Sequence, residues 1–418
     1  MTDGTKPSLY ASATGVVRKL QEGGYTAYFA GGSVRDQLLG RTVKDYDIAT
    51  SAHPEQVVRL FPKSRRVGAA FGVILVYSGG HAMEVATFRT DGVYSDGRRP
   101  AEVKFSTAEQ DALRRDFSCN GLFFNPINGD ILDFVGGRRD IAEKLLRAIG
   151  DPMERFAEDH LRMLRAVRFA ARLDFHIHPD TWNAMCSLAP KLQQISRERI
   201  GQEMRFMLTH PTRGQAVEML KASGLMDQVL PDVRPLNAGA ANHIENCLYV
   251  CKMPPTAGVA ACLAALLFEL GPAREVSPGL ADNLQKALVL SGQERADLAW
   301  LLEKLPVLRN WRNLRVAAIK RLMADARFSE LAALYQATLP SALPDIELQS
   351  RLEALARDPI GPPPLVTGND LLKIGAPAGP QFRHWLDELY DRQLENNFPD
   401  QASALAAAKQ MISSALPK

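Results

Sequence analysis

The sequence predicts an α+β domain with a mixed sheet at the N-terminus, followed by an all-α region. Short apolar runs bounded by glycine-rich turns fill the first 150 residues, which is typical of strands. After the break at Gly150-Asp151-Pro152, apolar residues recur at helical spacing almost to the C-terminus. Because 418 residues are too many for one compact core, we expect two to four modules.

The composition is that of a cytoplasmic protein that contacts no membrane. The N-terminus lacks an apolar secretion signal, and the longest uncharged apolar run, Thr256 to Phe268, is shorter than the roughly 20 residues of a membrane span. Five irregularly placed cysteines indicate a reducing compartment. The net charge is only +3, yet basic clusters gather in the first 175 residues, as phosphate binding requires. No obligate protein partner is evident.

The first 150 residues alternate helices and strands. A helix over 8–22 ends at a glycine pair, and a strand over 25–30 leads into a double-glycine turn and a short helix. A strand carrying two aspartates follows, then a helix that Pro54 begins, and then a hairpin over 72–77 and 83–88. A mixed sheet with helices is the simplest arrangement of these elements.

The paired aspartates predict a metal site. Asp45 and Asp47 lie two residues apart on a strand, so their carboxylates leave one face side by side. Carboxylates this close repel each other unless a cation lies between them, and Mg²⁺ prefers hard oxygen ligands that it shares with phosphates. Gly31 and Gly32 let main-chain N–H groups approach a triphosphate at a helix N-terminus. The stretch is therefore predicted to bind a metal and a nucleotide.

Three further features each admit two interpretations. Glu84, an isolated acid on an apolar strand, either faces water or completes the metal site as a third carboxylate. The segment from Thr90 to Pro100 is rich in turn formers, so it is either a solvated connection or a lid whose arginines meet phosphate. Arg115 and Asp116 form either a structural ion pair or a phosphate contact beside a ribose hydroxyl acceptor.

A helix is predicted over 158–173. Its apolar side chains fall on nearly every side, so the helix should be buried and its charges need partners. Asp159 and Arg162, three residues apart, are neighbours on one face, where an intrahelical salt bridge is the common explanation. The sharper explanation is a protein template, because a carboxylate and a guanidinium together would accept cytosine and adenine and reject uracil and guanine. A further helix begins at Ser196, with Arg199 and Glu203 spaced for an i,i+4 pair.

Taken in order, these motifs resemble the class II tRNA nucleotidyltransferases, or CCA-adding enzymes, and the bacterial poly(A) polymerases. The resemblance is specific over residues 25–205 and looser after that. Its motifs are Gly31-Gly32-Ser33-Val34-Arg35-Asp36, Asp45-Tyr46-Asp47, Arg114-Arg115-Asp116-Phe117, Glu158-Asp159-His160-Leu161-Arg162, Arg165-Ala166-Val167-Arg168-Phe169-Ala170 and Ser196-Arg197-Glu198-Arg199.

The resemblance implies a fold of four modules. These are a polymerase-β-like nucleotidyltransferase head over 1–150, a helical neck over 151–230 that selects nucleotides and binds RNA, a body over 231–358 and a tail over 359–418. Some relatives carry a His-Asp phosphohydrolase in the body. The equivalent stretch, Leu267-Phe268-Glu269-Leu270-Gly271, lacks that pair, so we expect no hydrolase activity.

The resemblance also implies roles for the residues of the head. Asp45 and Asp47 bind magnesium, and Glu84 is expected to join them as a catalytic carboxylate. Gly32, Arg35 and Arg115 meet the triphosphate or the ribose of the nucleotide.

In the neck, the implied roles concern the base. Asp159 and Arg162 choose it, and Arg165 and Arg168 support the site or contact phosphates.

The implied activity is the addition of CCA to the 3′ end of tRNA from CTP and ATP, with Mg²⁺ as cofactor. The loop from Thr90 to Pro100 favours full CCA or A addition, and the stretch over 67–73 is closer to CCA-adding than to poly(A)-adding enzymes. Two alternatives within this chemistry are an A-adding enzyme and a poly(A) polymerase. Alternatives of other kinds are a non-catalytic RNA-binding protein and a small-molecule nucleotidyltransferase.

Overall fold

The computed structural model describes residues 7–68, 72–91, 103–231, 248–269, 279–339, 343–377 and 379–415. The chain forms two compact units. The first comprises Met1–Arg234 with Lys286–Val289, and the second comprises Pro235–Gln285 with Leu290–Lys418. The module boundaries expected at 150, 230 and 358 are finer than this division and stay a prediction.

A seven-stranded sheet forms the centre of the first unit, in the order β3-β4-β5-β2-β1-β8-β9. The pairing of β2 with β5 is parallel and the other five pairings are antiparallel, which confirms the expected mixed sheet. The strands are β1 (Ala27–Ala30), β2 (Asp47–Thr50), β3 (Ser64–Gly68), β4 (Val73–Ser78), β5 (His81–Thr87), β8 (Leu122–Phe124) and β9 (Ile131–Asp133).

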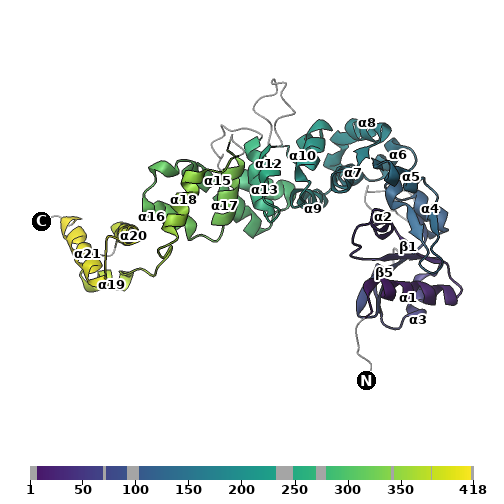
Figure 1. Cartoon of the computed structure of the whole chain (residues 1–418), viewed down its shortest axis with the longest axis horizontal. Helices are drawn as coiled ribbons and strands as arrows, with labels where there is room; N and C mark the ends of the chain where they lie inside the picture. Colours follow the sequence, from purple (N-terminus) through teal and green to yellow (C-terminus); the bar gives the residue numbers. More distant parts are fainter. Residues whose placement is uncertain are drawn as a thin grey trace. The chain divides into compact units, whose positions relative to one another are not determined.

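Helices flank this sheet (Figure 1). α1 (Leu9–Glu22) begins at the Ser8 cap and packs against β1 and β4, because its buried residues recur at helical spacing. α3 (Pro54–Leu60) packs against β4 and β5, and α2 (Gly32–Leu38) packs against β1 and β8. The helices expected over 8–22 and from Pro54 are therefore confirmed.

The remaining elements of the head are short. β6 (Arg89–Asp91) pairs with β7 (Val103–Phe105) in a separate ribbon. The others are α4 (Ala108–Leu113), the 3₁₀ turn η2 (Ser118–Asn120), α5 (Gly137–Ala142) and β10 (Leu145–Leu146).

The first unit continues without a break into helices. β10 pairs in parallel with β11 (His176–Ile177), which ties the sequence before residue 150 to the sequence after it. The helices are α6 (Pro152–Glu158), α7 (Leu161–Leu173), α8 (Pro179–Leu188), η3 (Ala189–Gln194), α9 (Arg197–Leu208), α10 (Arg213–Ala222) and α11 (Leu225–Val229).

The helix expected over 158–173 is interrupted, which corrects the sequence prediction. α6 ends at Glu158, and Asp159 takes an extended conformation with φ −151° and ψ 102°. α7 then begins at Leu161, whose N–H donates to the Asp159 carboxylate at 3.0 Å. A short polar side chain that accepts from a nearby N–H favours the start of a helix over its interior.

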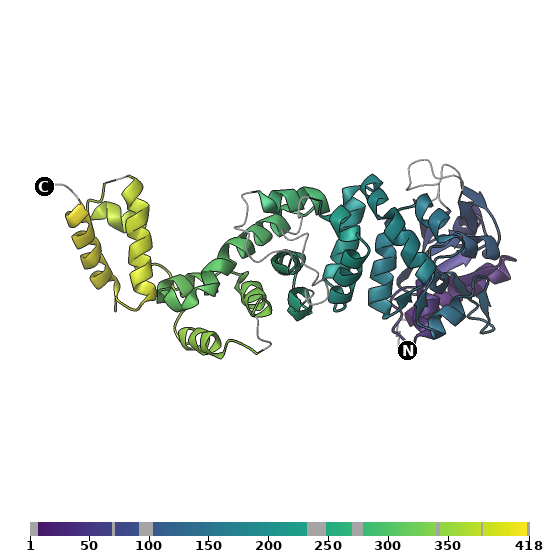
Figure 2. The same ribbon diagram turned by 90° about the horizontal axis from the view of Figure 1, so that it is seen from above.

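The described part of the second unit contains helices and no strand, as expected (Figure 2). The apolar run after Thr256 forms α13 (Val259–Glu269), which is a core helix. No described helix has the length and apolar character that a membrane span needs. The helices are α12 (Leu248–Lys252), α13, α14 (Leu280–Leu288), α15 (Gly292–Arg309), η4 (Trp311–Asn313), α16 (Val316–Met323), α17 (Phe328–Ala337), α18 (Ile346–Leu355), α19 (Gly368–Lys373), α20 (Pro380–Leu394) and α21 (Gln401–Ala415), and the end of α14 belongs to the first unit.

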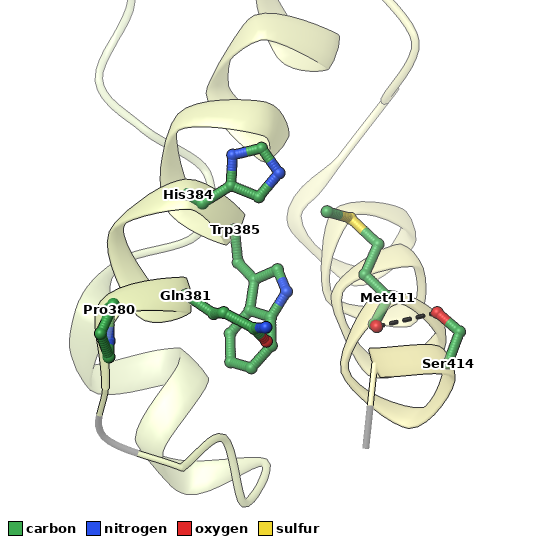
Figure 3. A pocket seen from close by; sticks show the side chains of 6 residues that line it. All are labelled: Pro380, Gln381, His384, Trp385, Met411 and Ser414. Carbon is green, nitrogen blue, oxygen red and sulfur yellow. Dashed lines mark hydrogen bonds between the residues drawn. The ribbon is translucent and has the colours of Figure 1, made fainter. Parts of the chain in front are cut away.

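The last three helices enclose a small core around Trp385, which is 5% exposed. An open pocket with a volume of about 450 Å³ lies between α20 and α21. Figure 3 shows the side chains that line it. Its lining consists of Pro380, Gln381, His384, Trp385, Met411 and Ser414. This pocket lies in the second unit, whereas all the site residues expected from the sequence lie in the first.

The contact between α9 and the end of α14 gives the first testable prediction. A Cβ atom on Gly201 would lie 2.0 Å from the backbone oxygen of Leu288, and a backbone atom cannot move aside alone. We expect Gly201→Ala to lower the free energy of unfolding by about 1–3 kcal/mol or more, because it overpacks this contact.

The matched control is Gly15→Ala in α1, where a Cβ atom would meet nothing within 4 Å. That change should be neutral or slightly stabilising, because alanine has the higher helix propensity. Urea unfolding of both variants is the measurement. Equal stabilities for the two variants would contradict the predicted contact.

Candidate active site

Three carboxylates gather where β2 begins. Asp47 is the first residue of β2, and it lies opposite Ala30 of β1. β2 and β5 run parallel with Ile48 opposite Val85, so the preceding residues, Asp47 and Glu84, are neighbours on adjacent strands. Asp45 lies two residues before Asp47. We call Asp45, Asp47 and Glu84 the acidic edge.

The acidic edge is electrostatically unsatisfied. The pKa of Asp47 is raised from 3.8 to about 6, first by the loss of water around its carboxylate and then by the negative charges of Glu84 and Asp45, while Arg115 opposes the shift. The Asp47 side chain remains open to solvent on one side although protein crowds the other. Within the described ranges, no residue makes a hydrogen bond or an ion pair with these three carboxylates.

These residues are chemically suited to a divalent cation. Carboxylate oxygens that repel one another and have no cationic partner are the ligands that a hard divalent ion prefers. In the part of the chain that the structure describes, no group of three or more His, Cys, Asp or Glu residues is arranged so that it could hold a metal ion. The three carboxylates of the acidic edge therefore do not form an assembled metal site in this structure.

Gly31 follows Ala30, the residue opposite Asp47, and comes close to Arg115. It caps α2 with φ +69°, and a Cβ atom there would lie 2.8 Å from Nη1 of Arg115. Glycine meets both demands, the positive φ and the close approach. Gly32 is the first residue of α2 and adopts an ordinary φ.

Asp111 holds Arg115 in place. Arg115 donates from Nε and Nη2 to Asp111 at 3.2 and 2.9 Å, and from Nη1 to the Asn120 carbonyl oxygen at 3.2 Å. Burial would raise the pKa of Asp111, but Arg115 and Arg114 lower it below its ordinary value. Sequence reasoning missed Asp111, although its position three and four residues before two arginines was an available signal.

Asp116 is wholly engaged within the protein, and its partner is not Arg115. Its Oδ2 accepts from Nε and Nη2 of Arg165 at 2.9 and 2.6 Å. Its Oδ1 accepts from the Asn120 amide at 3.0 Å and from the Phe117 N–H at 2.8 Å. Burial opposes ionisation, yet Arg165 and these hydrogen bonds lower the pKa of Asp116 to about 2. The expectation that Arg115 and Asp116 pair with each other is therefore wrong.

Arg35 extends this buried network to α2. Its Nη1 donates to Oδ1 of Asn120 at 2.5 Å, and Nε and Nη2 donate to Asp36 at 2.9 and 2.7 Å. The network therefore runs from Asp36 through Arg35 and Asn120 to Asp116 and Arg165, and it joins α2 to α7.

Asp159 and Arg162 do not pair with each other, so an intrahelical salt bridge is also wrong. Asp159 accepts from Nη1 and Nη2 of Arg199 at 3.2 and 2.6 Å. Arg162 donates to Glu158 and, at 2.8 Å, to the carbonyl oxygen of Arg155. Both side chains are nearly buried, and each is fixed by its own partner.

The charges of α7 and α9 interlock. Nε of Arg168 donates to Glu203 at 2.5 Å, while Arg199 binds Asp159, so the i,i+4 pair expected between Arg199 and Glu203 does not form. The expectation that α7 is buried is confirmed, and Arg162, Arg165 and Arg168 each have a carboxylate partner as expected, whereas Arg172 at the end of the helix is exposed. The lid expected from Thr90 to Pro100 lies mostly outside the described residues.

Comparisons with known proteins show the family to which this chain belongs. The family model described as "Poly A polymerase head domain" matches residues 27–147. A second family model, described as "Probable RNA and SrmB-binding site of polymerase A", matches residues 174–236. A CCA-adding enzyme from Geobacillus kaustophilus is 36% identical over 91% of this chain and 92% of its own length. Another from Streptococcus gordonii is 41% identical over 63% of this chain and 65% of its own.

The fold comparison gives the same result. A Bacillus stearothermophilus CCA-adding enzyme, solved in complex with CTP, matches with a TM-score of 0.79 and 29% sequence identity. The match covers 98% of each chain. The near full-length similarity, together with the head-domain match, shows that this chain is a nucleotidyltransferase of the CCA-adding enzyme family.

Proposed function

We propose that this chain adds C, C and A to the 3′ end of tRNA, using CTP and ATP and releasing pyrophosphate. The observation that supports this most is the acidic edge, which lies beside Gly31 and Arg115 without a cationic ion-pair partner among the described residues. We infer the class of substrate from membership in the CCA-adding enzyme family, and we infer CTP as one substrate from the relative that was solved with it. With tRNA as substrate, we place the activity in the cytoplasm.

The family implies a divalent metal, and we propose that it is Mg²⁺, held by Asp45 and Asp47 with Glu84 as a third carboxylate. When bound, the metal would lower the pKa of the RNA 3′-hydroxyl and neutralise the departing pyrophosphate. Asp47 must lose its proton to act as a ligand, which its raised pKa makes harder at low pH.

For the nucleotide, we propose that Arg115 is the main phosphate contact of the head. Asp111 and the Asn120 carbonyl fix its guanidinium against Gly31, so its position is set before a ligand arrives. Gly31 and Gly32 keep the backbone at this place free of side chains. Arg35 and Asp116 lie in the buried network, so we assign them to positioning the site, although the sequence suggested direct contacts.

For the base, we propose the Asp159 and Arg162 template. The two side chains do not pair with each other, because Arg199 holds Asp159 and Glu158 holds Arg162, so a separate partner fixes the position of each. Arg165 and Arg168 support this template, because each braces α7 through a carboxylate.

The proposed activity is tested with tRNA transcripts that end before CCA or after CC, supplied with CTP and ATP separately and together. Asp45→Asn and Asp47→Asn should each lower the rate of transfer by about a thousandfold or more, because each removes a proposed metal ligand. Asp180→Asn is the control, since Asp180 is an exposed acid on α8.

Each outcome of this assay has one meaning. Addition of C, C and A to the shorter transcript supports the proposal. A single A added only to the CC-ended transcript, or long A tails on any RNA, would replace it with A addition or poly(A) synthesis. No transfer at all would contradict the enzyme function.

The raised pKa of Asp47 predicts opposite effects of one substitution on activity and on stability. In the unfolded chain this carboxyl ionises near 3.8, and in the folded, metal-free chain near 6, so the folded state loses stability as pH rises through this window. Asp47→Asn should therefore melt at a higher temperature than the unchanged protein above pH 6, without metal. Near pH 4 the difference should be small. An equal gain at both pH values would contradict the assigned cause.

The base template predicts a change in nucleotide choice. Asp159→Ala should lower the preference for CTP over UTP, measured as the ratio of kcat/KM values, by about 100-fold or more, because hydrogen-bonding sites discriminate strongly. Asp174→Ala removes an exposed carboxylate that pairs with Lys144, and it should leave this ratio unchanged. A variant that loses rate equally for both nucleotides would refute the template.

A further inference from the structure

Phe206 is an exposed aromatic ring on the helix that braces the proposed base template. The side chain lies on α9 and is 52% exposed, more than any other large aromatic residue exposed in the described ranges. The transfer reaction as proposed above does not use it. Covering an exposed aromatic ring is favourable in free energy, because it removes apolar surface from water. The residues around the ring indicate which kind of group could cover it.

The ring lies on the same face of α9 as the residues that hold α7. Arg199, Glu203 and Phe206 are spaced at i, i+4 and i+7, which places them along one side of the helix. Arg199 binds Asp159 of the template, and Glu203 binds Arg168. At 1.5 Å per residue, Phe206 lies about 10 Å along the helix from Arg199. That length is about three stacked bases at roughly 3.4 Å each.

One arginine lies beside the ring, and two more lie at the end of α7. The Arg168 guanidinium carbon lies 5.6 Å from the centre of the Phe206 ring and 4.3 Å from that of Phe169. Arg172, one turn further along α7, is exposed, and its guanidinium makes no hydrogen bond or ion pair within the described residues. Arg41 is also exposed, and it donates to the carbonyl oxygens at the end of α7 at 3.1 and 3.3 Å.

The lowered pKa of the neighbouring His210 has the same positive charges among its causes. Burial lowers its pKa first, and the charges of Arg172, Arg41 and Arg213 lower it further. No carboxylate contributes to this shift. The surface formed by Phe206, Arg168, Arg172 and Arg41, which we call the basic stripe, is therefore suited to a ligand that is aromatic and anionic.

We propose that Phe206 stacks on an unpaired base of the RNA substrate, about three nucleotides before the incoming one, and that Arg172 and Arg41 bind the adjacent phosphates. Single-stranded RNA offers exposed base faces and phosphates together, which protein surfaces generally do not. This proposal rests on the proposed function, because the position of the stacked base, about three nucleotides away, is counted from the proposed base template. A protein partner would instead favour apolar neighbours around the ring.

The test uses a tRNA transcript that ends in CC and carries 2-aminopurine at the nucleotide before CC. Binding of the full-length protein should change the fluorescence of this base through stacking, and Phe206→Ala should abolish that change. The KM for this RNA should rise about tenfold in Phe206→Ala, within the range seen when a stacking ring is removed. The kcat and the KM for ATP should stay within about twofold.

Matched variants separate stacking from a general structural effect. Phe206→Tyr keeps an aromatic face and should restore the KM for RNA to within about threefold. Tyr77→Ala removes a ring that is 45% exposed on β4 and should change neither readout. Arg172→Gln should weaken RNA binding and reduce the slope of log K against log salt by about 0.7, the value for one phosphate contact on a single strand.

Two results would overturn the proposal. One is an unchanged fluorescence signal and an unchanged KM for RNA in Phe206→Ala. The other is a Phe206→Ala variant that differs from the unchanged protein only in its oligomeric state by sedimentation, which would assign the ring to a protein contact. The fluorescence measurement needs no catalysis, so failure of nucleotide transfer would refute the proposed function separately from the stacking site.

Discussion

The ion pair between the buried Asp116 and Arg165 is the constraint on which the arrangement of the first unit depends. It joins the segment after α4 to α7, and loss of Arg165 would leave the buried charge of Asp116 without its cationic partner. Asn120 links the same carboxylate to Arg35, so the glycine turn and α7 share one network. The position of α2 relative to α7 is therefore fixed by hydrogen bonds with defined geometry.

The charged side chains of the first unit fall into two groups, those that have an ion-pair partner and those that have none among the described residues. The arginines of α7 that point into the protein each have a carboxylate, and Phe169 packs beneath three of the guanidinium groups in the network. The acidic edge has no such partner within the described ranges. Because a folded protein rarely leaves crowded charges unpaired, this contrast supports the proposal that the acidic edge meets a ligand.

The same contrast between paired and unpaired charge supports a second place, away from the acidic edge, where an anion would bind. Arg168 has Glu203 as partner and serves mainly to brace α7, whereas Arg172 faces solvent one turn later. α7 thus begins beside the proposed base template, is held by three ion pairs, and ends at the exposed Arg172. This order is the basis for the RNA contact proposed above.

The sequence by itself determined the types of the elements and the mixed sheet. α1 could be predicted because helical periodicity acts over three or four residues, whereas the strand expected to carry both Asp45 and Asp47 begins only at Asp47. The partners of the charges could not be predicted in this way. Asp116 and Arg165 lie 49 residues apart, Asp159 and Arg199 lie 40 apart, and only the packing of α7 on the head and on α9 brings them together. Local spacing limits which neighbours a side chain can reach, and tertiary structure decided which of the many arginines each carboxylate binds.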